Sequence, residues 1–126
     1  LEAGLGFAVR FNKDTQFIGR DALLFQRDEG VRKRLVMFTM DEAEYWPVLR
    51  EPIRRDGDVV GHLTSSGYGY SLGKMVGMGF VKNGGEPVDK EFVESGAYDI
   101  EIAGERIPAS ASLKAPYDPN GARMRG

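Results

Sequence analysis

The chain has 126 residues, of which 41% are hydrophobic, with a formal net charge of -2 and no cysteine. This length allows one compact domain, or one domain and a piece of another, and the composition is that of a folded protein with a core. The lack of cysteine excludes disulfides and thiolate-bound metals, and a single histidine excludes an all-histidine metal site within one chain. The weakly acidic balance argues against nucleic acid or an anionic membrane surface as a partner.

Hydropathy and the first residues of the chain bear on its location. No apolar stretch approaches the roughly 20 residues that a membrane-crossing helix needs, and residues 1–10 lack the charged start of a signal peptide. We therefore expect a soluble, intracellular protein. The chain begins at Leu1, already inside an alternating apolar pattern, which suggests that it is cut from a longer polypeptide.

Two elements are predicted in the first 30 residues. Residues 5–11 alternate large apolar side chains with small or polar ones, which is the period of a strand. Residues 12–15 supply turn formers. Residues 20–29 then have helical spacing, and Gly30 suits the left-handed position that follows a helix.

From Val31 onward the sequence changes to short strands separated by glycine, proline and aspartate turns, with no further segment of helix length. Residues 32–40 place apolar side chains on both faces of a strand, which predicts burial on both. Asp56-Gly57 lies between two extended runs and suits a hairpin turn that requires positive φ. Pro108 cannot donate to a ladder, which favours an edge position for the last strand.

This succession of elements predicts the fold class. Six or so short strands without crossover helices favour a mainly β fold, a small antiparallel Greek-key β-barrel, over a parallel α/β sheet. The barrel would occupy residues 31–126. Residues 1–30, a strand and a helix, would be a separate piece.

Few side chains in the sequence are suited to acid–base chemistry. Asp41, Glu42 and Glu44 have the pattern of a solvated acidic turn, and we expect Trp46 to be a hydrophobic plug under that loop. His62 has no neighbouring nucleophile or carboxylate motif, so we interpret it as a structural hydrogen-bonding residue rather than a base. The residues alone predict no catalytic constellation and no metal site.

Residues 64–81, TSSGYGYSLGKMVGMGFV, combine five glycines and two tyrosines with no carboxylate. Gly77 and Gly79 leave one face of a strand bare, and we interpret them as a device for tight packing rather than as a ligand-facing strip. Tyr68 and Tyr70 could present ring faces to a flat polar ligand, or could be sheet-edge residues in a turn. The glycine spacing is not that of a dinucleotide-binding fingerprint.

Several segments, taken in order, resemble one family. They are LEAGLGFAV, FIGRDAL, PIRRDGDVVGHLTS, YSLGKMVGMGFV and IEIAGERIPASASLKAPYDP. Together they resemble the C-terminal part of the folate-dependent aminomethyltransferases, a family that includes the glycine cleavage T-protein and the tetrahydrofolate-binding half of dimethylglycine and sarcosine dehydrogenases. The segments YGYSLGK and LKAPYDPNGARMRG are most similar to the flavin-linked dehydrogenases.

The resemblance implies a C-terminal fragment that is inactive alone. An upstream domain of the same polypeptide would bind FAD and oxidise a methylated amine, and tetrahydrofolate would capture the one-carbon unit in a channel between three domains. Residues 1–30 would be the tail of the preceding folate-binding domain. Residues 31–126 would be the C-terminal β-barrel, which forms one wall of the channel. The location would be the cytoplasm or, in a eukaryote, the mitochondrial matrix.

The resemblance also implies residues that contact folate. Phe7 stands where many relatives carry Trp, and an aromatic ring there is a folate neighbour. Thr64, Ser65 and Tyr68 match a family loop that faces the channel. No catalytic residue is assigned, because the important aspartate of the family would lie upstream of this chain.

The C-terminal tail offers a further pair of candidates. Arg123 and Arg125 could meet the glutamate carboxylates of folate. We favour the interpretation that they belong to a disordered basic tail.

Two alternatives stay open. The chain could be the C-terminal domain of a glycine cleavage T-protein, whose partner is a lipoylated carrier protein. It could also be a non-catalytic barrel that serves as an interaction module, as in translation factors. Salt-dependent RNA binding would favour that module, and the net charge of -2 counts against it.

Overall fold

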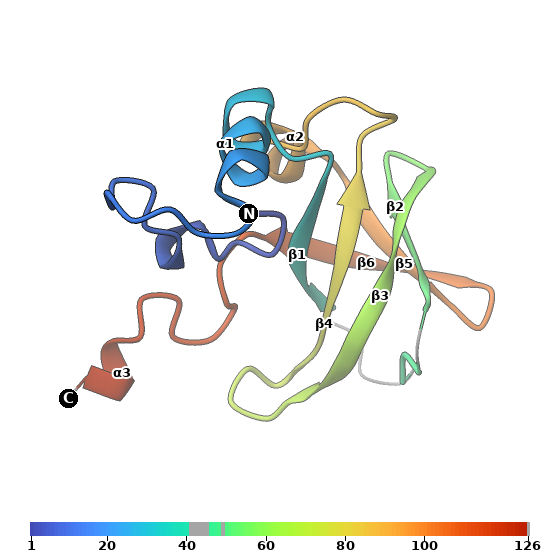
Figure 1. The fold of residues 1–126 in the computed structure, drawn as a ribbon. Helices are drawn as coiled ribbons and strands as arrows, with labels where there is room; N and C mark the ends of the chain where they lie inside the picture. Colours follow the sequence, from blue (N-terminus) through green and yellow to red (C-terminus); the bar gives the residue numbers. More distant parts are fainter. Residues whose placement is uncertain (41–45, 49, 126) are drawn as a thin grey trace.

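The computed structural model describes residues 1–40, 46–48 and 50–125. Within these residues, six strands form a closed barrel in the order β1-β4-β3-β2-β5-β6 (Figure 1), and all neighbours are antiparallel. The strands are β1 (Lys33–Met40), β2 (Pro52–Arg55), β3 (Asp58–Gly69), β4 (Lys74–Lys82), β5 (Tyr98–Ile102) and β6 (Glu105–Ser112). Because β5 returns to lie beside β2 of the β2-β3-β4 meander, the predicted Greek-key barrel is confirmed.

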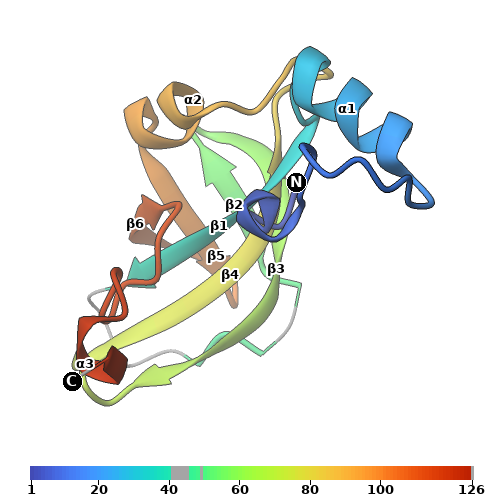
Figure 2. The ribbon, with the colours of Figure 1, turned by 60° about the vertical axis from the view of Figure 1, so that its left-hand side comes forward.

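The helices are short and lie outside the sheet. They are the 3-10 helix η1 (Gly6–Ala8), α1 (Arg20–Glu29), α2 (Lys90–Ser95) and α3 (Ala122–Arg125). Figures 1 and 2 both show α1 and α2 at one end of the barrel and the β3–β4 hairpin at the other. None of the helices in the described part of the chain is long and apolar enough to cross a bilayer.

The sequence predicted α1 with its observed bounds and missed α2. The side chain of Asp89, the residue before α2, accepts a hydrogen bond from the Phe92 amide at 2.7 Å. Aspartate is a favoured N-cap because its carboxylate satisfies an amide that has no partner inside the helix. This capping signal was present in the sequence, although α2 is too short to show a helical period.

The strand predicted over residues 5–11 is wrong. η1 occupies Gly6–Ala8, and Gly4 has a φ of 76°. None of the strand pairings in the described part of the chain includes residues 5–11, and the bond from the N-terminal segment to the barrel, from the Leu35 amide to the Glu2 carbonyl oxygen at 2.8 Å, lies before them. Alternating side chains do not make a strand where the backbone has no sheet edge along which to pair.

Two glycines were predicted to adopt positive φ, Gly57 in a hairpin turn and Gly30 after the first helix, and only the first has the predicted conformation. Asp56 and Gly57 have φ values of 53° and 95° between β2 and β3, so the predicted hairpin turn is confirmed. Gly30 also has a positive φ, 79°, but its ψ of 159° is extended, so it is not in the left-handed helical conformation.

The core lies inside the barrel. Val36, Phe38 and Met40 of β1 point inward and are fully buried, whereas Leu35 and Met37 on the outer face are only half-buried. The predicted burial on both faces therefore holds fully for one face only. The other buried apolar residues are Ile53, Leu63, Met75, Val81, Val88, Val93, Tyr98, Ile100, Ile102 and Ile107.

The two glycines of β4 face this core. Gly77 and Gly79 alternate with buried Met75 and Val81 along the inner face. A Cβ atom on Gly79 would collide with the His62 carbonyl oxygen and lie 2.6 Å from Ile53 Cδ1. This confirms that the glycines serve close packing.

The last strand is not the edge strand that we predicted. β6 pairs with β5 from Glu105 to Ala109 and with β1 from Ala109 to Ser112, which closes the barrel. Pro108 lies one residue beyond the pairing with β1. Its missing N–H therefore removes no bond from that ladder, which is why closure tolerates a proline here.

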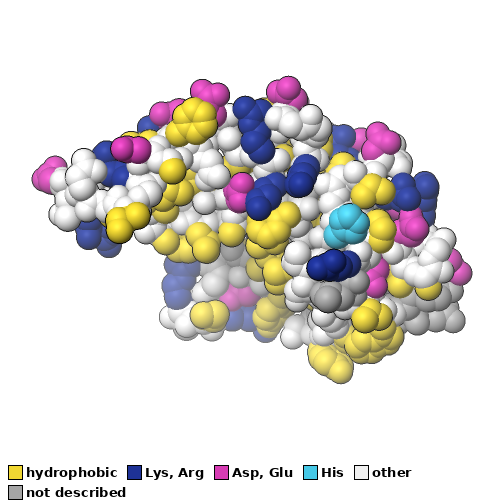
Figure 3. Space-filling model, turned by 45° about the vertical axis from the view of Figure 1, so that its right-hand side comes forward, with side chains coloured by type: hydrophobic (Ala, Val, Ile, Leu, Met, Phe, Trp, Pro, Cys, Tyr) yellow, Lys and Arg dark blue, Asp and Glu magenta, His cyan; other side chains and the backbone are white. Residues whose placement is uncertain are grey.

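The prediction that Trp46 is a buried plug is also wrong, because its side chain is 63% exposed. The neighbouring Pro47 is buried instead, and its carbonyl oxygen accepts a hydrogen bond from Ser66 Oγ at 2.8 Å. His62 lies exposed on β3 (Figure 3). The predicted acidic turn falls on residues 41–44, outside the described residues.

Arg55 joins the β2–β3 hairpin to α2. Its Nε donates to the Phe92 carbonyl oxygen at 3.1 Å, its Nη2 donates to Ser95 Oγ at 3.1 Å, and its guanidinium lies 4.3 Å from the centre of the Phe92 ring. Tyr98 is buried beside this group, and its hydroxyl donates to the same carbonyl oxygen at 3.5 Å. Burial raises the pKa of Tyr98 above 10.0, and the Arg55 charge opposes that change.

This burial predicts a loss of stability in alkali. Tyr98 ionises more readily in the unfolded chain than in the folded chain, so its contribution is complete below about pH 10 and is lost as pH rises through the folded-state pKa. We expect Tyr98→Phe to flatten the fall in unfolding free energy between pH 9 and pH 11, measured by urea titration. Tyr70→Phe, at an 86% exposed position, is the matched control. Equal slopes for wild type and Tyr98→Phe would contradict this account.

Candidate functional site

An apolar groove runs along the outer face of the β3–β4 hairpin. We call it the hairpin groove; its volume is about 470 Å³. The lining residues are Met37, Ser65, Ser66, Gly67, Tyr68, Gly69, Leu72, Val76, Gly77, Met78, Ala115, Pro116 and Tyr117. Two of the four predicted folate contacts, Ser65 and Tyr68, belong to it.

A β-bulge in β3 sets the position of Ser65. Leu63 pairs with Gly79 and Ser65 pairs with Met78, so Thr64 is the extra residue between them. Thr64 Oγ1 donates to the Met78 carbonyl oxygen at 3.1 Å and is absent from the groove lining. The bulge shifts the alternation of β3 by one residue, which places Ser65 on the same outer face as Met78.

Tyr68 lies further along β3, with Met75 as its cross-strand partner. Its side chain packs against the core, and its ring meets Tyr70 edge-on with centroids 5.1 Å apart. We expected Thr64, Ser65 and Tyr68 in a loop, and this was wrong: all three belong to β3, and the turn to β4 comes only after Gly69. The extended pairing of β3 with β4 through Gly69 explains the difference.

The C-terminal segment closes one side of the hairpin groove. Ala115, Pro116 and Tyr117 line the groove, and the following residue, Asp118, accepts hydrogen bonds from the Ala122 and Arg123 amides at 2.8 and 3.1 Å. Arg123 Nη1 also donates to Tyr117 Oη at 2.8 Å. These bonds form α3, so the expectation of a disordered basic tail was wrong. The local Asp118 cap was not recognised in the sequence.

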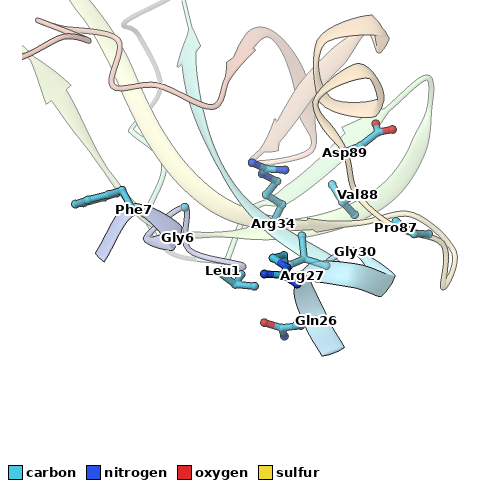
Figure 4. A pocket seen from close by; sticks show the side chains of 12 residues that line it. Leu1, Gly6, Phe7, Gln26, Arg27, Gly30, Arg34, Pro87, Val88 and Asp89 are labelled. Atoms are coloured by element: carbon cyan, nitrogen blue, oxygen red, sulfur yellow. The ribbon is translucent and has the colours of Figure 1, made fainter. Parts of the chain in front are cut away.

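Phe7 lies elsewhere, beside a cavity of about 390 Å³ at the α1 and α2 end of the barrel. We call this the helix-end cavity; its lining is Leu1, Gly4, Gly6, Phe7, Gln26, Arg27, Gly30, Val31, Arg34, Pro87, Val88 and Asp89. The Phe7 side chain is 86% exposed, and Figure 4 shows its ring pointing away from the other lining residues. The structure therefore does not bring Phe7 together with Ser65 and Tyr68.

The hairpin groove is suited to binding rather than to acid–base chemistry. It offers hydroxyl groups, tyrosine rings and methionine side chains, and the described residues that line it include no carboxylate, histidine or lysine. In the described part of the chain there is no group of three His, Cys, Asp or Glu residues placed to hold a metal. Sequence reasoning missed Met37 and Tyr117, because they reach the groove only through barrel closure and the path of the C-terminal segment.

Known proteins resemble the chain over most of its length. The family described as glycine cleavage T-protein C-terminal barrel domain matches residues 33–118. Mitochondrial sarcosine dehydrogenase of Homo sapiens is 42% identical over 100% of this chain and 14% of its own length. The mitochondrial pyruvate dehydrogenase phosphatase regulatory subunit of Mus musculus is 43% identical over 90% of this chain and 14% of its own length.

A solved structure shares the fold. The glycine cleavage system aminomethyltransferase T from Bartonella henselae superposes with a TM-score of 0.71 and is 28% identical, covering 89% of this chain and 30% of its own chain. The chain thus spans about one seventh of the length of the curated relatives named above. Because the family match covers more than half of the chain, this chain belongs to the glycine cleavage T-protein C-terminal barrel domain family.

Proposed function

We propose that this chain is the C-terminal part of a tetrahydrofolate-dependent, FAD-linked dehydrogenase of the sarcosine and dimethylglycine type. In that protein it forms one wall of the channel where tetrahydrofolate accepts a one-carbon unit. The observation that carries the proposal is the hairpin groove, which contains Ser65 and Tyr68 on a barrel that belongs to the T-protein family. FAD would be held by other domains of the longer polypeptide.

The residues of the hairpin groove fit a flat ligand with a polar edge. Its volume of about 470 Å³ lies within the range of small-molecule sites. Met37, Met78 and Leu72 supply apolar surface, and the exposed Ser65 hydroxyl supplies a donor and an acceptor. Tetrahydrofolate would bring the amine nitrogens that accept the one-carbon unit, and the groove would hold its ring and exclude water.

Residues 1–30 support the proposal of a preceding domain. No residue of α1 is buried, and Phe25 and Ile18 are 69% and 105% exposed. The family match also begins only at Lys33. We propose that this segment completes the preceding folate-binding domain and that Phe7, whose ring is exposed, contacts that domain or its folate.

Two alternative functions are each supported by one observation. The likeness to an aminomethyltransferase structure fits a T-protein whose partner is a lipoylated carrier, and the likeness to a regulatory subunit fits a non-catalytic barrel. Sequencing the complete reading frame separates the dehydrogenase from the T-protein, and salt-dependent RNA binding would favour the non-catalytic barrel. A flavin-binding domain upstream supports the dehydrogenase, and its absence supports the T-protein.

The proposal predicts little activity for the isolated chain. Calorimetric titration of the 126 residues with tetrahydrofolate should show weak or no binding, because most of the channel lies in other domains. An assay with sarcosine or dimethylglycine should show no oxidation. Tight folate affinity, or amine oxidation by this chain alone, would overturn the proposal.

The neighbouring hydroxyl residues Ser65 and Thr64 of β3 allow a test variant and a matched control variant in the full-length protein. We expect Ser65→Val to weaken tetrahydrofolate binding about fivefold to tenfold, because a hydroxyl bound to ligand contributes about 1–1.4 kcal/mol. Thr64→Val removes only the bond to the Met78 carbonyl oxygen, so it should leave folate affinity within twofold and lower the unfolding free energy by about 1 kcal/mol. Equal folate affinities for wild type and Ser65→Val would remove Ser65 from the channel wall.

A further inference from the structure

The helix-end cavity contains charged groups that the proposed function does not use. Arg27 belongs to α1, Arg34 belongs to β1, and Asp89 immediately precedes α2 (Figure 4). Polar side chains that line a cavity of this size commonly orient a small ligand. The question is which of these groups is available to one.

Two of the charges are already engaged. Arg27 Nε donates to Asp28 at 2.8 Å, and the Arg27 guanidinium lies over the Phe11 ring at 5.3 Å from its centre. The Asp89 carboxylate caps α2 through the Phe92 amide. Both side chains therefore already have partners of their own within the chain.

Two neighbouring charges outside the lining are engaged with each other. Lys33 Nζ and Glu2 Oε2 lie 3.4 Å apart, and Gln26 Nε2 donates to Glu2 Oε1 at 3.4 Å. This pair sits where the Glu2 backbone meets the edge of β1. It adds no net charge to the cavity.

Arg34 differs from all of these. It lies on the inward side of β1 in alternation with Val36 and Phe38, and β6 pairs with β1 only from Met37 onward. Its Nε is buried and has no hydrogen-bond partner among the described residues. A buried N–H of a charged group without a partner is unfavourable, and a guanidinium is best satisfied by a planar carboxylate that accepts two parallel bonds.

We propose that Arg34 is a recognition site for a carboxylate group of a small ligand in the helix-end cavity. A carboxylate carries one negative charge, which balances the charge of the Arg34 guanidinium. A phosphate dianion would leave excess negative charge beside Asp89. Leu1, Val31, Pro87 and Val88 would contact the apolar body that carries the carboxylate. This inference does not depend on the folate proposal, which concerns the hairpin groove at the other end of the barrel.

The test is an NMR titration of the 126-residue chain, with the arginine Nε–Hε resonances as the readout. Benzoate is the probe, and benzamide is its neutral isostere. We expect saturable binding of benzoate that shifts the Arg34 resonance, and binding of benzamide at least tenfold weaker. Benzoate binding no tighter than benzamide binding, or no saturation, would overturn the proposal without any variant.

Two substitutions locate the site. Arg34→Gln should weaken benzoate binding at least tenfold, whereas Arg27→Gln should leave it within twofold, with folding checked by thermal unfolding. If Arg34→Gln fails to fold, Arg34→Lys keeps the positive charge but cannot donate two parallel hydrogen bonds to a carboxylate, so it should still weaken benzoate binding. Unchanged affinity in the Arg34 variant that folds would overturn the assignment. 4-Aminobenzoylglutamate then distinguishes a folate tail from other carboxylate ligands. If it competes with benzoate, a folate tail is one ligand of the site. If it does not compete, the ligand is another carboxylate.

Discussion

Gly79→Ala should lower the free energy of unfolding by at least about 3 kcal/mol, which is at the upper end of the cost of overpacking a core. The new methyl group would collide with the His62 carbonyl oxygen of β3 and lie 2.6 Å from Ile53 Cδ1. The carbonyl belongs to the paired backbone of the barrel and cannot move without breaking ladder bonds. Gly79 does not have positive φ, so the cost comes from contact and not from backbone conformation.

Gly77→Ala is the matched control on the same strand and the same face. Its Cβ would lie 3.1 and 3.2 Å from the two methyl carbons of Leu63, which are side-chain atoms able to adjust. We expect a loss of about 1 kcal/mol or less, since the entropy gained by replacing glycine offsets part of the contact cost. Urea unfolding of both variants measures the difference. A Gly79→Ala variant as stable as Gly77→Ala would show that the barrel can widen at this point.

Phe38→Ala should cost about 3–5 kcal/mol, the usual range for removing a buried aromatic side chain. Phe38 is fully buried, and its ring centroid lies 5.5 Å from that of Tyr98. Its cross-strand partners are Gly77 in β4 and Ala111 in β6. Because both partners are small and held in ladders, little can collapse into the space that the ring leaves.

Leu35→Ala on the outer, half-buried face of β1 is the comparison. We expect it to cost about 1 kcal/mol, the typical effect of a partly exposed substitution. Total stabilities of about 5–15 kcal/mol leave Phe38→Ala close to unfolding, so Phe38→Leu provides an intermediate point. A cost for Phe38→Ala no greater than that for Leu35→Ala would mean that the ring does not fill the barrel core.

The family resemblance and the strand-rich pattern could be predicted from the sequence, because each depends on residues that are close together in the chain. The Asp56-Gly57 hairpin follows from residues that accept positive φ. The bounds of α1 follow from helical spacing over ten residues. Family membership follows from several short segments in a fixed order.

The sites were readable only in part, because a groove depends on which strands become neighbours. The sequence indicated Ser65 and Tyr68, and the structure places both in the hairpin groove. The family resemblance implied a loop for them, whereas both belong to β3, in which the bulge at Thr64 shifts the alternation by one residue. It also grouped them with Phe7, which lies at the helix-end cavity.

By itself the sequence determined the strand-rich composition, the hairpin, the first helix and the family, all of which depend on residues near one another in the chain. Only the tertiary structure decided that residues 5–11 are not a strand and that β6 is paired on both sides, because pairing depends on which edges remain free. It also decided that Gly77 and Gly79 face inward. The alternation of side chains along a strand shows which residues share a face. Which of the two faces is inside is decided only when the barrel closes.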